Sequence, residues 1–309
     1  MTAPLVICEC FARDGLQHET TEVGTGDKIA LIDAMTQAGF PRIEATSYSH
    51  PKRVPGFADA SEVLTRIHRR PGVHYKATCP NPKAIDRALS DLAAGHGATE
   101  LSFLASATDS HSQRNLRATR EEQWTRVEEM ARLAGGKFRL VGVISVALGC
   151  PFEGAVDPGR VVEDVVRFAE LGAELVTVGD TVGTGTPKAV RTLWERFARE
   201  VPQVTCVAHF HDTRGTGIAN CLAALDGGAS HFDSAIGGVG GHPSEIRYGT
   251  GRTGNVATED LVSVLEAEGQ WTGIDLDRLM RISEQCEHVL GRQLDSKVAR
   301  AGLLRPQAA

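Results

Sequence analysis

Short runs of apolar, mostly β-branched residues recur at regular intervals along the 309-residue chain, and each has the length of a strand. The eight runs are LVICEC (5–10), RIEAT (42–46), HYKATC (74–79), ELSFLA (100–105), RLVGVIS (139–145), ELVTVGD (174–180), VTCVAHFH (204–211) and HFDSAIG (231–237). The pattern predicts eight strands.

The segments between these runs have the period of an amphipathic helix. One opens at Asp157-Pro158 and ends near Gly172, and its apolar residues are spaced i, i+3, i+4, i+7 at Val162, Val165, Val166 and Ala169. Another has Thr186 as predicted N-cap and Pro187 as first helical residue, followed by apolar Val190, Leu193, Trp194 and Phe197. Strands and helices therefore alternate.

Eight strand–helix units in succession predict a (β/α)8 TIM barrel, an α/β fold. The alternative is an open doubly wound sheet, which often has a glycine-rich GxGxxG turn after its first strand. Here the first strand leads into Arg13-Asp14-Gly15, which favours the barrel. We expect one domain over residues 1–309, with the barrel over about 5–268 and extra C-terminal helices over about 269–309.

Composition narrows the class of protein. The net charge of −6 comes from acidic and basic residues mixed along the chain, which argues against nucleic acid or an anionic membrane as partner. No apolar stretch approaches the length of a membrane span. The seven scattered cysteines indicate neither a zinc site nor a disulfide framework. Because the first apolar run leaves no room for a charged leader before it, we expect a cytoplasmic protein.

Polar residues collect where the predicted strands end, which is where TIM barrels carry their catalytic groups. They are Arg13, Asp14 and Gln17 after the first strand, Glu44 and Ser47 at the second, Asp180 and Thr181 at the sixth, His209 and His211 at the seventh, and His242, Asn255 and Glu259 after the eighth. The sequence therefore predicts a site at one rim of the barrel.

His209 and His211 lie two residues apart at a strand terminus, so their side chains share one face. Two neutral imidazoles bind a divalent ion well, and a carboxylate and an amide oxygen would complete a mixed nitrogen and oxygen site. Asp14 is the best carboxylate candidate because the first strand neighbours the eighth in a closed barrel. A helix cap or a salt bridge to Arg13 is the alternative role for Asp14.

The segment GGVGGHPSEIRYGTGRTGN (237–255) is rich in glycine and follows the last strand. Such a segment can close over a site or approach a phosphate, or it can be a flexible surface loop. Its position at the predicted catalytic rim favours a mobile lid that contains His242.

Six motifs resemble the 3-hydroxy-3-methylglutaryl-CoA lyases. They are RDGLQHE (13–19), SYSHPKRVPGFADASEV (47–63), ALGCPFEG (147–154), GDTVGTGTP (179–187), HFHDTRGTGIANCLAAL (209–225) and GNVATEDLV (254–262). The resemblance implies a TIM barrel that binds Mg²⁺ or Mn²⁺, forms a homodimer, and cleaves a 3-hydroxyacyl-CoA to an acyl-CoA and a keto acid by retro-aldol or retro-Claisen chemistry.

The resemblance also implies roles for individual residues. The implied metal ligands are Asp14, His209, His211 and Asn255. The implied catalytic residues are Arg13, Asp14, Glu44 and Asp180, with Arg13 facing the developing enolate. Substrate contacts are expected from Gln17, Ser47, Thr181 and Glu259, and contacts to CoA phosphates from Lys52, Arg53, Arg114 and Arg117.

One position departs from the family pattern. The family's flexible loop reads GGCP and its cysteine is thought to transfer a proton, whereas this chain has His242 there, in a longer loop. Imidazole can shuttle a proton near neutral pH, so His242 is a candidate replacement. Two other functions stay open: a Claisen-type synthase that condenses an acyl-CoA with an oxo acid, and a non-catalytic barrel that binds metal and ligand. The ALGCPFEG and GNVATED motifs favour the lyase.

Overall fold

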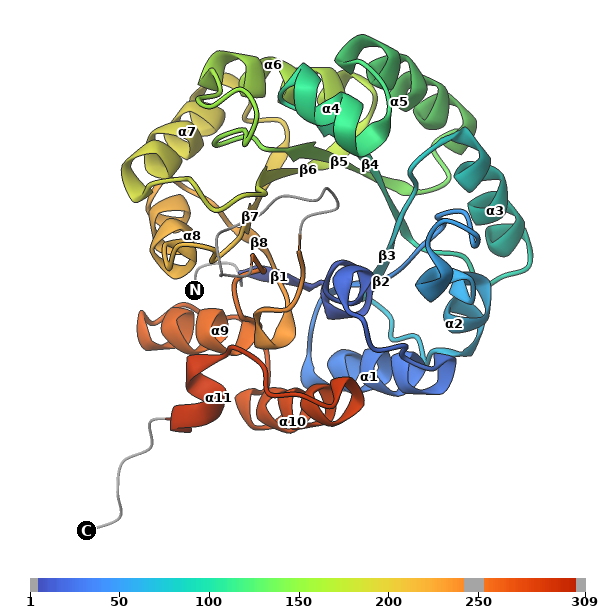
Figure 1. Cartoon of the computed structure of the whole chain (residues 1–309), viewed down its shortest axis with the longest axis vertical. Coiled ribbons are helices and arrows are strands. Elements are labelled where there is room, and N and C mark those ends of the chain that lie inside the picture. Colours follow the sequence, from blue (N-terminus) through green and yellow to red (C-terminus); the bar gives the residue numbers. More distant parts are fainter. Residues whose placement is uncertain (1–4, 242–252, 304–309) are drawn as a thin grey trace.

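Eight parallel strands close into a barrel in the order of the chain, in a computed structural model that describes residues 5–241 and 253–303 (Figure 1). The strands are β1 (Val6–Glu9), β2 (Arg42–Ser47), β3 (His74–Thr78), β4 (Glu100–Ser106), β5 (Arg139–Ser145), β6 (Ala173–Asp180), β7 (Thr205–Phe210) and β8 (His231–Ser234). The predicted TIM barrel is confirmed, and all eight expected runs form its strands. β1 pairs with β8, which excludes the open sheet.

Helices surround the barrel. They are α1 (Thr25–Ala38), α2 (Ala60–Arg66), α3 (Pro82–Ala93), α4 (Asp109–Leu116), α5 (Arg120–Ala134), α6 (Pro158–Glu170), α7 (Pro187–Glu200), α8 (Gly217–Asp226), α9 (Thr258–Ala267), α10 (Leu276–Leu290) and α11 (Lys297–Ala301). Helices α10 and α11 are the expected C-terminal addition. Figure 1 shows α10 beside α1, where the Asp275 amide donates to the carbonyl of Ala38 at 2.8 Å.

The two helices predicted in detail form as expected. Asp157 caps α6 by accepting a hydrogen bond from the Gly159 amide at 2.9 Å, and Thr186 caps α7 by accepting one from Ala189. Phe168 of α6 packs directly over Gly142 of β5, where a Cβ atom would collide with the phenyl ring. The helix can therefore approach the sheet closely at this point.

The interior of the barrel is divided between charged and apolar side chains. Val141, Leu175 and Val207 form a small apolar cluster separate from the large core under the helices. The charged side chains inside the barrel are all nearly fully buried, and they are Arg42, Glu44, Lys76, Glu100 and Asp233. Because isolated charges are costly to bury, these residues must neutralise one another.

Arg42 and Glu100 are the tightest of these pairs. The guanidinium donates from Nε to Oε1 at 3.1 Å and from Nη2 to Oε2 at 2.9 Å. This two-point pair links strands β2 and β4 across β3, which lies between them. The linked strands form a rigid base beneath the residues at the rim.

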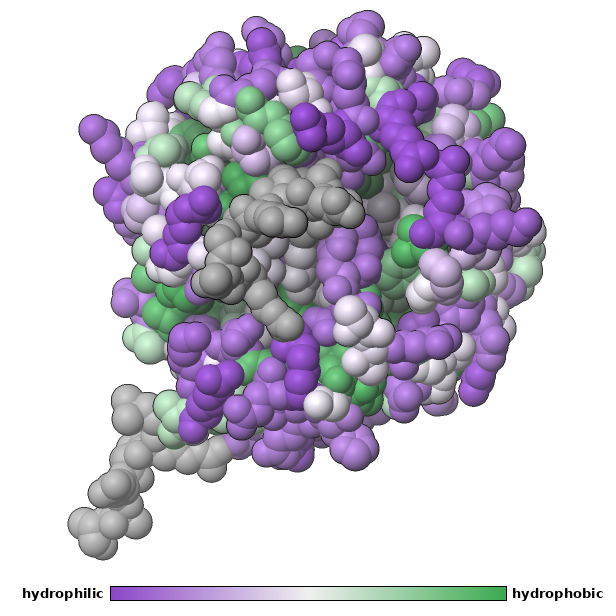
Figure 2. Space-filling model, viewed as in Figure 1, coloured by the Kyte–Doolittle hydropathy of each residue, from purple (hydrophilic) through white to green (hydrophobic). Residues whose placement is uncertain are grey.

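The face seen down the barrel axis is mostly hydrophilic and is hollowed near its centre (Figure 2). Within residues 5–241 and 253–303, no helix has both the length and the apolar character needed to cross a membrane.

Candidate active site

A cleft of about 270 Å³ opens at the carboxyl ends of the strands. Seven of the residues expected at the rim line it, namely Arg13, Asp14, Gln17, Ser47, Thr181, His209 and His211. A wider cleft of about 650 Å³ adjoins it and is lined by Asn255, Gly240 and His18, among others. His18 lines both clefts, so the two are neighbours.

Asp14, His209 and His211 form a group of potential metal ligands whose donor atoms all lie within 4.8 Å of one another. The two imidazole rings are 5.4 Å apart between centroids. β7 ends at Phe210, one residue earlier than predicted, and His211 instead forms an isolated bridge with Asn255. The backbone thus brings the fourth expected ligand to the other three.

Asn255 is held with its carbonyl oxygen available. Its Nδ2 donates to Asp14 Oδ2 at 2.7 Å and to the Val239 carbonyl at 3.0 Å. Its Oδ1 is buried and has no hydrogen-bond partner within residues 5–241 and 253–303, an arrangement that is costly unless a ligand satisfies the oxygen. Two imidazoles, a carboxylate and this amide oxygen are a donor set that suits a divalent cation.

Gly240 keeps the space beside these ligands open. A Cβ atom at this position would collide with Asn255 Nδ2 and would lie 3.5 Å from Asp14 Oδ2. Its φ of +128° also lies in the range that side chains with a Cβ rarely adopt. The residues present therefore fit a bound divalent ion.

The charge states in the site favour cation binding. Burial opposes ionisation of Asp14, but Arg13, His209, His211 and the Asn255 hydrogen bond outweigh it and hold the pKa of the carboxyl well below its usual range. Burial lowers the pKa of His209, but Asp233 and Asp14 reverse the shift and raise it in the metal-free protein. A divalent ion would replace that imidazole proton.

Arg13 and Asp14 are presented by a π-helical turn, Phe11–Gly15, directly after β1. The Gly15 amide donates to the Cys10 carbonyl at 3.1 Å, which closes the wide turn. Gly15 also packs against Val239, since a Cβ atom there would lie 2.6 Å from Val239 Cγ2. The turn is thereby fixed against the segment that follows β8.

The Arg13 guanidinium is clamped from two sides. Its Nη2 donates to Glu44 Oε2 at 2.8 Å, and its Nε lies 2.7 Å from Glu44 Oε1. Its Nη1 donates to Asp14 Oδ1 at 3.0 Å and to Gln17 Oε1 at 3.2 Å. Thr78 in turn donates to Glu44 at 2.8 Å. A guanidinium held in this way is oriented for an anion in the cleft.

Asp233 supports the metal group from behind, a role that the sequence analysis missed. His209 Nδ1 lies 3.4 Å from Asp233 Oδ2, which leaves Nε2 of the ring to bind a cation. Lys76 Nζ lies 3.7 Å from the same oxygen, and Arg42 Nη1 lies 3.8 Å from the other. Both Asp233 and Lys76 also line the cleft. The feature of the sequence that could have revealed this role is the presence of charged residues inside predicted strands.

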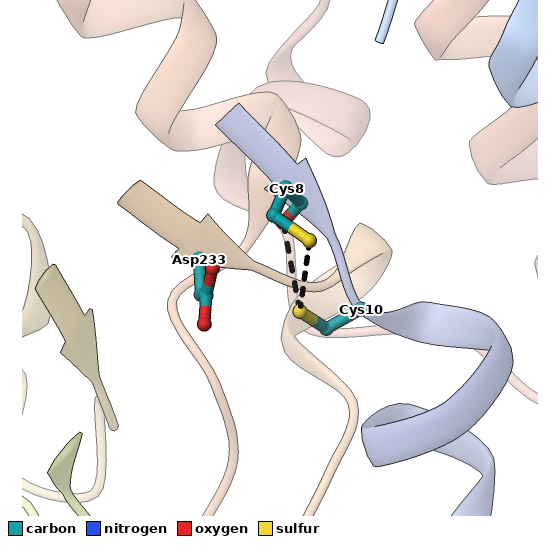
Figure 3. Close-up of side chains that lie close together, drawn as sticks. All are labelled: Cys8, Cys10 and Asp233. Carbon is teal, nitrogen blue, oxygen red and sulfur yellow. Dashed lines mark hydrogen bonds between the residues drawn. The ribbon is translucent and has the colours of Figure 1, made fainter. Parts of the chain in front are cut away.

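A second group of potential ligands, Cys8, Cys10 and Asp233, lies inside the barrel (Figure 3). The two sulfur atoms on and after β1 are 4.0 Å apart. The hydrogen bond to Cys8 and burial raise the pKa of Cys10, which opposes the thiolate that a metal requires. Lys76 and Arg42 already compensate Asp233. This group therefore fits a structural role rather than a cation site.

Asp180 and Glu259 lie behind the cleft and do not line it. Asp180 accepts hydrogen bonds from the amides of Thr184 and Gly185, both at 2.9 Å. Glu259 accepts from the Gly237 amide and from the Ser283 hydroxyl. Each carboxylate thus holds a loop at the rim. Thr181 does line the cleft, and its Oγ1 accepts from the Val146 amide at 2.9 Å.

The expected proton donor His242 lies outside the described residues. The four basic residues expected at CoA phosphates, Lys52, Arg53, Arg114 and Arg117, are all exposed. Arg114 and Arg117 flank Asn115 and Leu116, which line the cleft. The Arg114 guanidinium stacks 4.3 Å over the Phe152 ring. A basic edge therefore borders the cleft on the side of α4.

Fold and site together define a barrel protein of the class that binds a divalent cation at the carboxyl ends of its strands. The match to known families is more specific. Residues 5–286 match the family model described as HMGL-like, and the chain belongs to this family. The resemblance expected from the six motifs is thus confirmed.

Similarity to individual proteins extends over nearly the whole chain. The mitochondrial hydroxymethylglutaryl-CoA lyase of Rattus norvegicus is 40% identical over 298 residues, covering 96% of this chain and 88% of the relative. The 3-hydroxy-3-isohexenylglutaryl-CoA/hydroxymethylglutaryl-CoA lyase of Pseudomonas aeruginosa is 39% identical over 302 residues, covering 97% of each. An HMG-CoA lyase structure from Acinetobacter baumannii, with coenzyme A and 3-methylmalate, is 37% identical, covers 100% of both chains and has a TM-score of 0.90.

Proposed function

We propose that the protein is a divalent-metal-dependent lyase that cleaves a 3-hydroxyacyl-CoA of the 3-hydroxy-3-methylglutaryl-CoA type. The products are an acyl-CoA, such as acetyl-CoA, and a keto acid. The observation that carries the proposal is the grouping of Asp14, His209, His211 and Asn255 beside the clamped guanidinium of Arg13. The lyase names of relatives that match over nearly the full chain support it.

The reaction breaks the bond between the hydroxyl-bearing carbon and the carbon next to the thioester. The hydroxyl loses its proton and becomes the ketone of the keto acid, while the electron pair of the broken bond forms the thioester enolate. A divalent ion held by Asp14, His209, His211 and Asn255 would acidify the hydroxyl and orient the substrate. Arg13, which Glu44 holds in place, stabilises the negative charge on the enolate oxygen.

Two proton transfers complete the reaction. The hydroxyl proton passes to a carboxylate beside Arg13, either Asp14, which lines the cleft, or Glu44. The enolate carbon then takes a proton, and from its place in the sequence we assign this donation to His242. Asp180 and Glu259 act as positioning residues through the loops that they hold.

We further propose Mg²⁺ or Mn²⁺ as the ion, which the family resemblance implies and which the oxygens of Asp14 and Asn255 suit. The family resemblance supports a homodimer. All seven cysteines are unpaired, which is consistent with a reducing compartment and supports a cytoplasmic location. Elemental analysis of the purified protein and its mass in solution test the first two assignments.

The direct test is to strip the protein with a chelator, reload it with Mg²⁺ or Mn²⁺, and incubate it with 3-hydroxy-3-methylglutaryl-CoA. We expect metal-dependent release of acetyl-CoA, identified by mass. The Arg13→Gln variant should bind the metal but lower kcat by roughly 10²–10³-fold. A synthase would instead consume acyl-CoA and oxo acid without measurable cleavage, and a non-catalytic barrel would bind the ester unchanged. Either result contradicts the lyase assignment.

A further inference from the structure

Lys76 is a buried lysine whose ammonium group faces the cleft without a hydrogen bond to any residue that the structure describes. It belongs to β3, is 2% exposed and lines the cleft beneath the rim. Its Nζ lies 3.7 Å from Glu44 Oε2 and 3.7 Å from Asp233 Oδ2. Neither distance is a hydrogen bond, and no described residue accepts one from Nζ. Three N–H donors are thus held in a buried site without an acceptor in the described part of the chain.

Lys28, the other fully buried lysine of the described chain, shows what a structural lysine looks like in this fold. Its Nζ donates to both carboxylate oxygens of Asp59, at 3.0 and 2.9 Å, and to the Gly56 carbonyl. All three of its donors are satisfied within the protein. Because Lys76 is as deeply buried but is not hydrogen-bonded in this way, charge compensation alone does not account for its position.

The position of Lys76 connects the two halves of the site. Glu44 Oε2, which Lys76 approaches, accepts the hydrogen bond from Arg13. Asp233 Oδ2, which Lys76 also approaches, lies against His209. The ammonium therefore lies between the group that faces the enolate and the group that supports the metal. Any small ligand that contacts both comes within reach of Nζ.

The side chains that flank Lys76 are polar, although Leu104 and Val143 also line the cleft. Thr78, on the same strand, lines the cleft with its hydroxyl near Glu44. Thr177 of β6 also lines it and donates to Asp233 at 3.3 Å. A buried ammonium beside these two hydroxyls favours an anionic group over an apolar one at this end of the cleft.

We propose that Lys76 receives a carboxylate of the substrate, so that the cleft selects hydroxyacyl-CoA esters with an anionic group directed at the barrel floor. This inference rests on the proposed function. The carboxylate has two possible sources, namely the terminal acid group that all glutaryl esters share, and an acid group on the substituent of the hydroxyl-bearing carbon. A charge-assisted hydrogen bond from Lys76 Nζ to either carboxylate would give the ammonium an acceptor.

The test compares three esters: 3-hydroxy-3-methylglutaryl-CoA, its terminal carboxamide, and the analogue with a 3-carboxymethyl group. In the Lys76→Met variant we expect kcat/KM to fall about 10- to 100-fold for the ester whose carboxylate meets Nζ. A fall for 3-hydroxy-3-methylglutaryl-CoA but not for its carboxamide assigns the terminal acid. A fall confined to the 3-carboxymethyl ester assigns the substituent. The loss should lie mainly in KM.

The matched control is Lys188→Met, because Lys188 is an exposed lysine on α7. This variant should leave kcat/KM unchanged for all three esters. Lys76→Arg keeps the charge and should recover part of the loss. The proposal is overturned if Lys76→Met lowers kcat/KM equally for all three esters or for none of them. If the wild-type protein cleaves none of them with any metal, the lyase assignment itself is wrong.

A second measurement covers the case in which Lys76→Met does not fold, since it leaves Glu44 and Asp233 buried without their shared cation. A crystal structure of the wild-type holoprotein with a non-cleavable carboxylate analogue of the substrate shows the contact directly. A ligand carboxylate oxygen within hydrogen-bond distance of Lys76 Nζ supports the proposal. A bound analogue whose carboxylates all lie elsewhere refutes it, whatever the protein's activity.

Discussion

Asp233→Asn is the substitution that most clearly separates the two roles of Asp233, which are to orient a metal-binding histidine and to neutralise buried positive charges. Asparagine keeps the shape of the side chain and an acceptor oxygen but removes the negative charge behind His209. In the wild-type protein, burial opposes that charge, but Lys76, His209 and Arg42 outweigh it and keep the pKa of Asp233 well below its usual range. The carboxylate is therefore ionised at neutral pH. Its loss should change both the stability of the buried ion pairs and the affinity for the metal.

The size of each effect follows from the contacts. Loss of a carboxylate behind a ligating histidine typically weakens metal affinity by about 10- to 100-fold, or about 1.4–2.7 kcal/mol. Removing one partner of a buried ion pair costs about 3–5 kcal/mol of stability. After the substitution Arg42 still pairs with Glu100, and Lys76 still lies beside Glu44. Because both cations retain a carboxylate, we expect the unfolding free energy to fall by about 3 kcal/mol, the lower end of that range.

Two assays and one double variant separate these effects. Calorimetric titration with Mn²⁺ gives the metal affinity, and urea denaturation of the metal-free protein gives the stability. Adding Lys76→Met to Asp233→Asn removes an ammonium that has lost one of its two neighbouring carboxylates, so stability should partly recover while metal affinity stays low. Asp226→Asn is the control, because Asp226 pairs with Arg191 on the exposed surface.

The reasoning is refuted if Asp233→Asn binds Mn²⁺ with wild-type affinity, because His209 would then need no carboxylate behind it. Recovery of metal affinity in the double variant would also contradict it, since the effect would then come from the excess positive charge of Lys76 and not from the loss of the carboxylate behind His209.

Three further predictions test individual contacts. Glu44→Gln should lower kcat by about 100-fold with little change in metal affinity, because the guanidinium beside it loses its alignment; an unchanged kcat would contradict the clamp. Burial raises the pKa of Glu9 from 4.5 to about 8, so the folded protein keeps a proton that the unfolded chain releases, and stability should fall as pH rises between these values; Glu9→Gln should flatten this dependence in urea denaturation at pH 5 and pH 8. Gly15→Ala should cost about 1–3 kcal/mol because its Cβ would meet Val239, whereas Gly26→Ala, with open space around it, should cost nothing.

The strands and the rim could be predicted because their signals are local. Each strand is a short run that the turns on either side set apart, and the helix ends carry recognisable caps such as Asp157 and Thr186. The carboxyl end of a barrel strand then places His209 and Asp14 at one rim. These inferences need no knowledge of which side chains meet across the barrel.

The support behind the rim could not be predicted, because it depends on register around the closed sheet. Asp233 is opposite Cys8 on β1, and Lys76 is opposite Glu44 on one side and Glu100 on the other. These pairings join positions far apart in the sequence, so a charged residue inside an apolar run has no visible partner. The sequence likewise placed Glu259 at the site without showing that its carboxylate accepts hydrogen bonds from the Gly237 amide and the Ser283 hydroxyl.

The most direct test of the central claim is a calorimetric titration of chelator-stripped protein with Mn²⁺. We expect one ion per chain in the wild type, no measurable binding in His209→Ala or His211→Ala, and unchanged binding in His68→Ala, whose side chain is 89% exposed at the surface. If both His209→Ala and His211→Ala still bind one ion per chain with wild-type affinity, the cation does not sit between these imidazoles, and the assignment of the active site is wrong.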